Sequence, residues 1–400
     1  MRILLVSDYA TPTGGAEYLL LALRDGLRQR GHDARIFASS ARPLDQKSQA
    51  DYECLGTTSR FRTLLQTANP SAAWEFRRVV AEFRPDLVHV MLFLTQLSPL
   101  ILPALRGVPS LYHAVWHRAV CPLGTKMLPD GSTCQEPWGL ACYRNTCLPL
   151  RDWLPLMLQM RLWRRWDNTF DLVVANSEAV RQRLIADGFS SVEIVWNGVP
   201  VQPLRPPLAE PPAVAFAGRL VREKGADTLI RAFAEVVTQI PTARLLIVGD
   251  GPERERLRHL AASLGLRSPQ VKMPGYRPRE EVERLFGAAW VQAIPPRWPE
   301  PFPNVALEAM MRGTAVVATA AGGLTEIVQD GTTGLLVPTD DIGALSAGLQ
   351  TLLMDRELAE RLGRAGRDFA LAHYSESTYV DGFVRLYHRL LDRRGSLHVN

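Results

Sequence analysis

A proline-rich stretch divides this chain into two halves that share one structural pattern. Six of the 13 residues from 200 to 212 are proline, so this stretch can form neither a helix nor a central strand. Each half opens with a short apolar run, a glycine turn and an amphipathic segment, which predicts a strand, a turn and a helix. We therefore expect an α/β chain with domains at 1–199 and 213–375 and a linker at 200–212.

The apolar runs predict strands that are buried on both faces. They lie at Ile3–Ser7, Ala34–Ala38, Leu87–Met91, Pro109–His113, Leu172–Asn176, Val214–Ala217, Ala243–Val248 and Val291–Ile294. Such runs alternating with helices are typical of parallel sheets covered on both sides. Two Rossmann-like domains of this kind are expected to face each other across a cleft at the carboxyl ends of their strands, where α/β proteins bind ligands.

Composition excludes several other classes of protein. The chain has 400 residues, of which 46% are hydrophobic and 22% are charged, as in ordinary globular proteins. A net charge of +5 is too small to indicate a nucleic-acid partner. The first apolar run is too short for a signal peptide, and prolines and polar residues interrupt the longest uncharged stretch, 87–105. A cytoplasmic protein with no membrane span and with reduced cysteines is expected.

Two cations follow the first strand of the second half. Arg219 and Lys224 lie in the loop from Gly218 to Gly225, which should open at the carboxyl edge of the sheet. Fixed cations there could bind a diphosphate and offset the charge that grows on it as a leaving group. The alternative is solvated surface charge, but Lys224 is one of only four lysines in the chain, which favours a functional role.

Two carboxylates surround an expected helix start near residue 303. Prolines precede Asn304, so Glu300 should lie in a loop and Glu308 one turn inside the helix. The free N–H groups near Asn304 and Val305 could face a phosphate, while the carboxylates accept hydrogen bonds from sugar and ribose hydroxyls. The alternative is an ordinary helix start with surface glutamates.

A glycine turn also joins the first strand of the chain to its first helix, at Gly14–Glu17. It could place an anion at the helix N-terminus, or it could be a plain tight turn. The dinucleotide fingerprint Gly-x-Gly-x-x-Gly is absent, which argues against an NAD-dependent dehydrogenase.

Four of the five cysteines cluster in a segment rich in glycine and proline: Cys121, Cys134, Cys142 and Cys147. Four thiols suit a tetrahedral structural zinc, although no Cys-x-x-Cys pair is present. Disulfides and free thiols are the alternatives.

The segment that follows, 150–166, contains three Trp and four Arg among many Leu and Met residues. Such a mixture is typical of a helix on an anionic membrane surface, with its start expected near Pro155. The alternative is a core helix whose arginine stems cover apolar surface.

Several motifs together resemble those of retaining glycosyltransferase family 4, in the same order along nearly the whole chain. They are Gly14–Glu17, Asn197–Val199, Gly218–Gly225, Gly249–Pro252, Pro274–Tyr276, the pair Glu300 and Glu308 around Phe302–Val305, and Gly322–Glu326. The resemblance implies a GT-B fold and transfer of a sugar, with retention, from a nucleotide-diphosphate donor to a hydroxyl. It also implies that a tail helix, 376–394, returns to the first domain.

The same resemblance assigns roles to individual residues. Arg219 and Lys224 would hold the diphosphate, Glu308 the ribose and Glu300 the transferred sugar. Gly275 and Tyr276 would lie by the base, and Gly15 near the donor phosphate and the acceptor. His113 would lie near hydroxyls of the sugar, although Ala114 stands where the family has Asp; His117 is a second candidate, and a buried structural His113 is the alternative.

No cofactor is expected for catalysis, because the family does not require a metal and the sequence has no Asp-x-Asp pair. The expected partners are a nucleotide-sugar, a sugar or lipid-linked acceptor in glycan or polysaccharide synthesis, and the inner face of an anionic membrane. Two alternatives stay open. One is an epimerase or phosphorylase on the same fold, and the other is a non-catalytic module that binds nucleotide-sugars.

Overall fold

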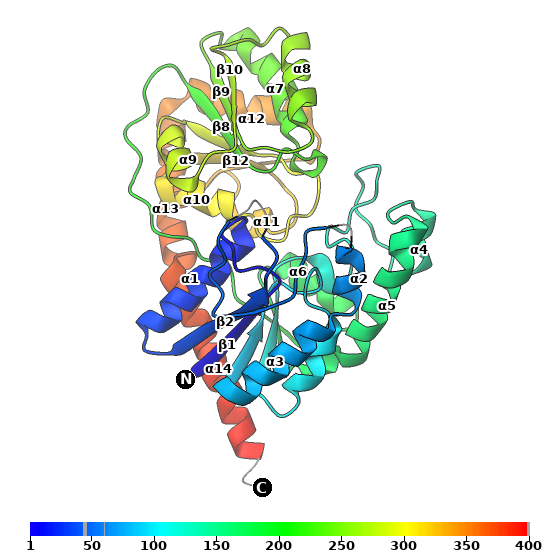
Figure 1. Ribbon diagram of the computed structural model, residues 1–400. Helices are drawn as coiled ribbons and strands as arrows, with labels where there is room; N and C mark the ends of the chain where they lie inside the picture. The colour runs from blue at the N-terminus through cyan, green and yellow to red at the C-terminus, as the bar shows by residue number, and fades with distance from the viewer. Residues whose placement is uncertain (43–45, 60, 398–400) are drawn as a thin grey trace. The chain divides into compact units, whose positions relative to one another are not determined.

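The computed structural model describes residues 1–42, 46–59 and 61–397, and its contacts divide the chain into two compact units. The first unit comprises residues 1–130, 134–198 and the chain from Glu376 on. The second comprises residues 131–133 and 199–375. Each unit is a parallel sheet with helices on both faces (Figure 1), which confirms the predicted α/β class.

Within the described residues, the first unit has a seven-stranded sheet in the order β3-β2-β1-β4-β5-β6-β7. Every pairing in it is parallel. The five predicted strands form its middle, and sequence reasoning missed only the three-residue strands at its edges. The strands are β1 Arg2–Ser7, β2 Asp33–Ser39, β3 Tyr52–Cys54, β4 Leu87–Val90, β5 Ser110–Ala114, β6 Leu172–Ala175 and β7 Val192–Ile194.

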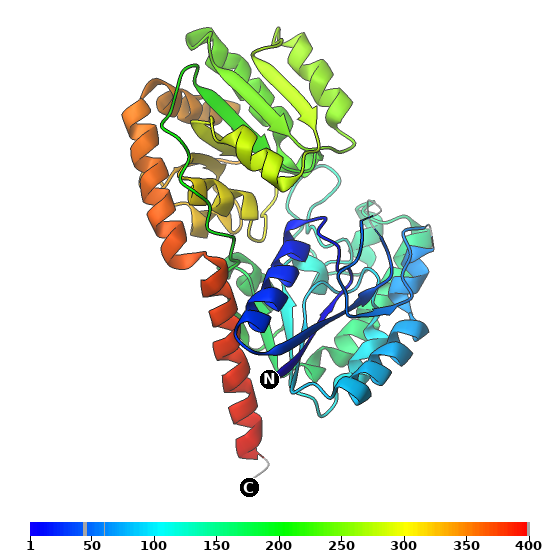
Figure 2. The same ribbon diagram turned by 60° about the vertical axis from the view of Figure 1, so that its left-hand side comes forward.

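Two helices from opposite ends of the chain cover one face of this sheet. They are α1 Gly15–Gln29 and α14 Glu376–Leu397, which lie side by side in Figures 1 and 2. Phe383 and Tyr387 of α14 join the apolar cluster that Ile3 and Leu5 of β1 form on this face. The C-terminal helix is therefore part of the core of the first unit.

The other face carries α3 Pro70–Phe83, α5 Leu150–Trp166 and α6 Glu178–Ala186, whose apolar side chains form a second cluster. A 3-10 helix, Pro99–Leu105, packs in the same cluster. The remaining short helices of this unit are α2 Arg62–Thr67, α4 Leu140–Arg144 and the 3-10 turns His117–Ala119 and Asp167–Thr169.

In the described part of the second unit, six strands pair in the order β10-β9-β8-β11-β12-β13, all in parallel. Their bounds are β8 Ala213–Ala217, β9 Arg244–Val248, β10 Val271–Gly275, β11 Val291–Ile294, β12 Ala315–Thr319 and β13 Leu335–Val337. Each of the three strands predicted in this half is present.

The helices of the second unit lie on both faces of its sheet. Apolar residues of α7 Ala226–Gln239, α8 Arg254–Ser263 and α12 Ile342–Met354 pack on one face. Those of α9 Arg279–Phe286, α10 Asn304–Arg312 and α11 Leu324–Ile327 pack on the other. Residues of α13 Arg356–His373 contribute to a cluster on each side.

The proline-rich stretch 200–212 contains neither helix nor strand, and it is fixed to the second unit. The buried guanidinium of Arg205 donates to the carbonyl of Gly313 at 3.0 Å and pairs with Glu360 at 3.1 Å. The backbone N–H of Leu208 donates to the same carboxylate at 3.1 Å. This stretch is therefore an ordered strap along the second unit.

Candidate active site

The loops that follow β8, β9 and β10 are hydrogen-bonded to one another. The N–H of Gly218 donates to Val248 O at 3.1 Å, and that of Gly249 donates to Gly275 O at 3.1 Å. The N–H of Leu220 donates to Asp250 O at 2.9 Å. Because parallel strands end at the same edge of a sheet, these loops form one surface there. That surface carries Arg219, Lys224 and Tyr276, three of the residues predicted to bind a donor.

Close backbone contacts explain two of the glycines in the predicted motifs. A Cβ at Gly225, where φ is +68°, would lie 1.9 Å from Pro295 O, so only glycine fits between this loop and the end of β11. A Cβ at Gly322, where φ is +57°, would lie 2.3 Å from Glu300 O. The next N–H, of Gly323, donates to Glu300 O at 2.8 Å. These contacts fix the backbone on both sides of the predicted site.

Lys224 and Glu300, which lie 76 residues apart in sequence, form an ion pair. Their side chains are only 19% and 11% exposed, so solvent screens the pair weakly. Arg297 supports this arrangement, because its N–H donates to Glu223 O at 2.8 Å and its guanidinium pairs with Asp227 at 2.7 Å. The loop after β11 therefore holds the lysine loop in place.

Arg219 is an exposed side chain in the same loop. Among the described residues, it has no ion-pair partner within 4.0 Å. A guanidinium that is not neutralised by the protein is available to an anionic ligand. The structure thus places two cations in one loop, one of them paired with Glu300.

The helix predicted after the prolines is α10, which begins at Asn304 after an extended Pro303. In its first turn the backbone N–H of Ala306 donates to Pro303 O at 3.0 Å. Glu308 lies one turn inside, and its carboxylate is 3.0 Å from the guanidinium of Arg279 in α9. Burial raises the pKa of Glu308, although Arg279 and Arg312 lower it.

Gly275 and Tyr276 stand at the end of β10. Gly275 has a φ of +85°, and a Cβ there would lie 2.9 Å from the guanidinium of Arg254, so that side chain covers the glycine. Tyr276 is 52% exposed. An exposed ring beside a glycine can stack on a planar base, as the sequence predicts.

Gly15 is the first residue of α1 in the first unit, after the extended cap residue Gly14. A Cβ at Gly14 would lie 2.6 Å from a carboxylate oxygen of Glu17, so this helix start already has an acidic side chain folded over it. The carboxylate complements the positive end of the helix.

The structure buries His113, which the family resemblance places near the sugar. His113 lies in β5 and its side chain is fully buried. The centroid of its ring lies 4.8 Å from that of Phe383 and 5.4 Å from that of His89. Neither ring nitrogen has a hydrogen-bond partner among the described residues. Burial lowers the pKa of His113 to about 3. In this structure the ring of His113 is therefore part of the core, which is the alternative stated for it above.

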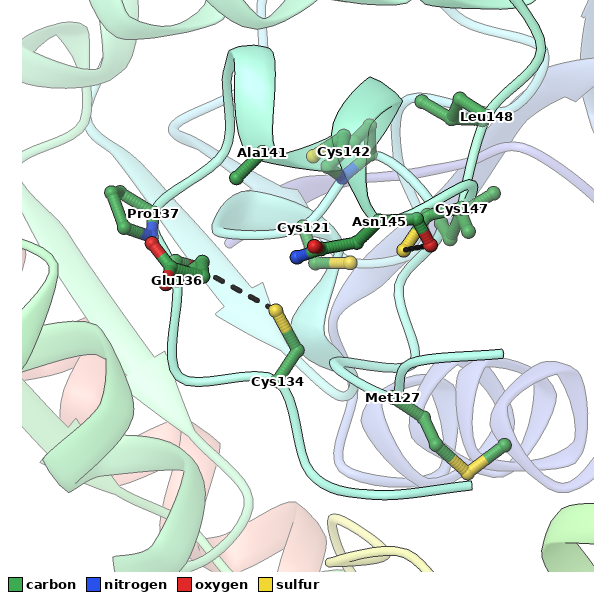
Figure 3. A pocket seen from close by; sticks show the side chains of 12 residues that line it. Cys121, Met127, Cys134, Glu136, Pro137, Ala141, Cys142, Asn145, Cys147 and Leu148 are labelled. Carbon is green, nitrogen blue, oxygen red and sulfur yellow. Dashed lines mark hydrogen bonds between the residues drawn. The ribbon is translucent and has the colours of Figure 1, made fainter. Parts of the chain in front are cut away.

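The four clustered cysteines come together in the first unit. All four line one small cavity within the 121–148 segment, which includes α4 (Figure 3). In the described part of the chain the cysteines are free thiols, not disulfides. No group of three or more His, Cys, Asp or Glu among the described residues is already arranged to hold a metal ion.

The tryptophan-rich segment is α5, and it begins at Leu150 rather than near Pro155 as predicted. Pro155 is thus the sixth residue of the helix, and the helix continues through it. Trp163 is fully buried and packs 5.1 Å from Tyr112. The indole N–H of Trp153 donates to Gly139 O at 2.9 Å. The inner face of α5 is thus a core face.

The outer face of α5 is apolar and basic. Leu150, Leu154 and Leu158 are 52%, 59% and 50% exposed, and Arg161 and Arg165 continue the same stripe of the helix. In the part of the chain that the structure describes, no helix is long and apolar enough to cross a bilayer.

Sequence reasoning missed Arg279 and Arg297, which hold Glu308 and the lysine loop. Arg279 follows a proline, and Arg297 lies between a proline and a tryptophan. Such neighbours are a weak signal of function in a chain so rich in arginine. Their partners become evident only once α9, α10 and β11 are packed together.

Comparison with known proteins adds the family. Residues 13–202 match the family model described as Glycosyltransferase Family 4, and residues 205–369 match the one described as Glycosyl transferases group 1. A GDP-mannose-dependent alpha-(1-6)-phosphatidylinositol monomannoside mannosyltransferase of Mycolicibacterium smegmatis is 28% identical over 401 residues, covering 94% of this chain and 95% of the relative.

Solved structures share the fold over almost the whole chain. Sucrose-phosphate synthase from Thermosynechococcus elongatus superposes with a TM-score of 0.75 at 23% identity, covering 98% of this chain and all of that one. Anabaena Alr3699/HepE in complex with UDP-glucose superposes with a TM-score of 0.70 at 21% identity, covering 97% of this chain and 100% of the other.

Proposed function

Since the chain belongs to the glycosyltransferases described as family 4 and group 1, with the GT-B fold, we propose that it transfers a sugar with retention and without a metal. The donor is a nucleoside-diphosphate sugar held by the second unit, and the first unit binds the acceptor. The observation that carries this proposal is the ion pair between Lys224 and Glu300. The loop that contains Lys224 also exposes Arg219.

The cations suit the diphosphate for a simple electrostatic reason. An ammonium group has three donors, so Lys224 can keep its bond to Glu300 and still donate to a phosphate oxygen. Arg219 adds a charge that no carboxylate among the described residues neutralises, and the start of α10 adds the positive end of a helix. Together they stabilise the negative charge that develops on the departing diphosphate, which is the work that Mg²⁺ does in other transferases.

The carboxylates then orient the donor. Glu300, fixed by Gly323 on one side and Lys224 on the other, accepts hydrogen bonds from hydroxyls of the transferred sugar. Glu308, held by Arg279, accepts those of the ribose. Tyr276 lies by the base. Each role needs an acceptor or a stacking face whose position is set before the donor arrives, which lowers the entropic cost of binding.

In the reaction, the bond between the anomeric carbon and the diphosphate oxygen breaks while the acceptor oxygen bonds to the same face of that carbon. The acceptor proton passes to the departing phosphate oxygen. Because both events occur on one face, the anomeric configuration is retained. His113 has no part in this scheme, because its ring is buried in the core.

The acceptor is a lipid-linked sugar or polyol at an anionic membrane, in the synthesis of a glycan or polysaccharide. The mycobacterial relative is named for a phosphatidylinositol-linked acceptor, which supports a lipid here. The outer face of α5 supports it independently, because exposed leucines and arginines complement apolar and anionic lipid groups. The protein would then work in the cytoplasm as a peripheral protein at the inner face of the membrane.

Thermal unfolding with a panel of donors tests the donor assignment. A ligand at 100 times its dissociation constant stabilises the folded protein by about 2.7 kcal/mol. We expect UDP or GDP sugars to raise the unfolding temperature, and the matching nucleoside monophosphate to do so much less. Equal shifts with mono- and diphosphates would contradict a diphosphate site at Arg219 and Lys224.

Product analysis separates this function from its alternatives. With donor and acceptor present, NMR of the product should show the anomeric configuration of the donor. A donor that isomerises without any acceptor would indicate an epimerase. Binding without turnover, over a broad panel of acceptors, would indicate a binding module.

A further inference from the structure

Four cysteines of the first unit lie in a segment that has little other means of holding its shape. Between Val120 and Leu150 the only helix in the described structure is the five-residue α4, and the rest is turns and irregular chain apart from single bridge residues at 127 and 133. Backbone hydrogen bonds close three local turns, from Gly124 to Cys121 at 2.9 Å, from Cys134 to Lys126 at 2.8 Å and from Leu148 to Cys142 at 3.0 Å. Each of these turns contains or adjoins a cysteine.

The four side chains nevertheless share one location. Cys121, Cys134, Cys142 and Cys147 all line a cavity of about 20 Å³, roughly the space of one water-sized sphere. Figure 3 shows that they come from separate stretches, with Cys142 on α4 and Cys134 on the opposite loop. Most other lining residues are apolar, among them Leu123, Met127 and Leu148, so the cavity offers little to an ordinary water molecule.

We propose that these four thiols bind one zinc ion as thiolates, and that the ion ties the four stretches of the 121–148 segment together. Zinc in structural sites takes four cysteine sulfurs at about 2.3 Å in a tetrahedron. The sulfurs are not yet at that spacing. The proposal requires the sulfurs to move inward by rotation about χ1, the single side-chain torsion that places a cysteine sulfur.

Two of the thiols have only weak partners to give up. Cys134 Sγ lies 3.8 Å from Glu136 O, and Cys147 Sγ lies 3.7 Å from Asn145 O. Sulfur–carbonyl contacts of this length are weak hydrogen bonds, so a metal bond to the thiolate would replace them readily. Protons would leave the four thiols as the ion enters.

The zinc content of the whole protein tests this directly. Protein purified in reducing buffer should contain close to one zinc per chain by elemental analysis, and Cys121→Ser and Cys142→Ser should each lose most of it. Cys54→Ser is the matched control, because Cys54 is buried at the end of β3 outside the cluster, and it should keep its zinc. Less than a tenth of an equivalent in the wild type after growth in zinc would overturn the proposal.

A second measurement uses only the wild-type protein, so it stays informative if the cysteine variants fold poorly. Cobalt(II) added to metal-free wild-type protein should give the thiolate charge-transfer and visible bands of a tetrahedral cobalt–sulfur site, saturating at one equivalent. Absence of these bands, or a mass spectrum of the unreduced protein with two disulfides among the four cysteines, would contradict zinc binding. Neither readout depends on sugar transfer, so both stay valid if the proposed function is wrong.

Discussion

The guanidinium of Arg279 lies 3.0 Å from the carboxylate of Glu308, joining the first turn of α9 to α10. Burial favours the protonated form of Glu308, and Arg279 opposes it. The arginine therefore opposes protonation of the proposed ribose ligand and fixes its orientation.

Replacing Arg279 by Gln should weaken donor binding more than turnover. Without the cation the pKa of Glu308 rises further, so a larger share is protonated and accepts ribose hydroxyls less well. We expect the donor KM to rise on the order of three- to tenfold, with the larger increase at acidic pH. Steady-state kinetics between pH 5.5 and 8 measures it.

Arg284→Gln is the matched control, because Arg284 is an exposed arginine in the last turn of the same helix. It should leave KM within about twofold of the wild type. If both variants changed kcat alone, or changed KM equally, Arg279 would have no specific part in donor binding.

His113→Phe should make the protein less sensitive to acid. The folded-state pKa of His113 is lowered to about 3, whereas an unfolded histidine titrates near 6.5. Between these values the unfolded state binds more protons, so the free energy of unfolding falls as the pH falls from about 6.5 towards 3. Within that window, one such group lowers the free energy of unfolding by about 1.4 kcal/mol for each unit that the pH falls.

Phenylalanine has a similar shape and no proton to gain. Relative to wild type, the unfolding temperature of His113→Phe should therefore improve steadily from pH 6.5 down to pH 4. His259→Gln, an exposed position in α8, controls for loss of one imidazole. A constant difference between variant and wild type across this range would mean that His113 is accessible to protons in the folded protein.

Charge reversal on the outer face of α5 should release the protein from anionic vesicles. Each arginine near an anionic bilayer contributes about 1 kcal/mol of attraction, so Arg161→Glu with Arg165→Glu should weaken binding at least tenfold. Co-sedimentation with phosphatidylglycerol vesicles at low salt measures the bound fraction. Leu154→Ser with Leu158→Ser should weaken binding at high salt as well, because the apolar part is not screened.

The matched control reverses two arginines elsewhere. Arg361→Glu with Arg364→Glu on α13 changes the net charge by the same amount and should sediment like the wild type. Wild-type protein that stays in the supernatant with these vesicles would remove the membrane from the proposal and leave α5 as a packed helix.

Sugar transfer should continue when free divalent ions are removed. The loop cations and the start of α10 are proposed to stabilise the leaving diphosphate, so brief EDTA treatment should change the initial rate by less than about twofold. Circular dichroism in parallel monitors folding. A large loss with intact folding, restored by Mg²⁺ or Mn²⁺, would show that a metal handles the leaving group.

Much of the fold was predictable because its signals are local. The apolar run at Leu87–Val90 is too hydrophobic for an exposed element. The prolines before Asn304 make Asn304 the earliest residue at which the next helix can begin. Family resemblance added the motif residues at the ends of the strands. The loop glycines are consistent with the local signals and with the family motifs, since Gly225 and Gly322 lie where a Cβ would overlap backbone atoms.

The errors concern contacts between distant segments. His113 ends a strand and resembles a ligand in sequence, but Phe383, 270 residues further on, brings α14 over it. Pro155 suggested a helix boundary, yet the helix begins five residues earlier, at Leu150, and includes the proline. Pairs such as Arg279 and Glu308 depend on how two helices pack, which no local pattern in either helix determines.

The turnover of Lys224→Ala tests the central claim most directly, that this lysine stabilises the departing diphosphate. A buried charge-assisted contact supplies more than about 1.4 kcal/mol, so kcat should fall at least tenfold in a variant with wild-type circular dichroism. Lys272→Ala, an exposed lysine in β10, should keep the wild-type rate. A correctly folded Lys224→Ala protein that turned over at the wild-type rate would contradict the assignment of the donor site.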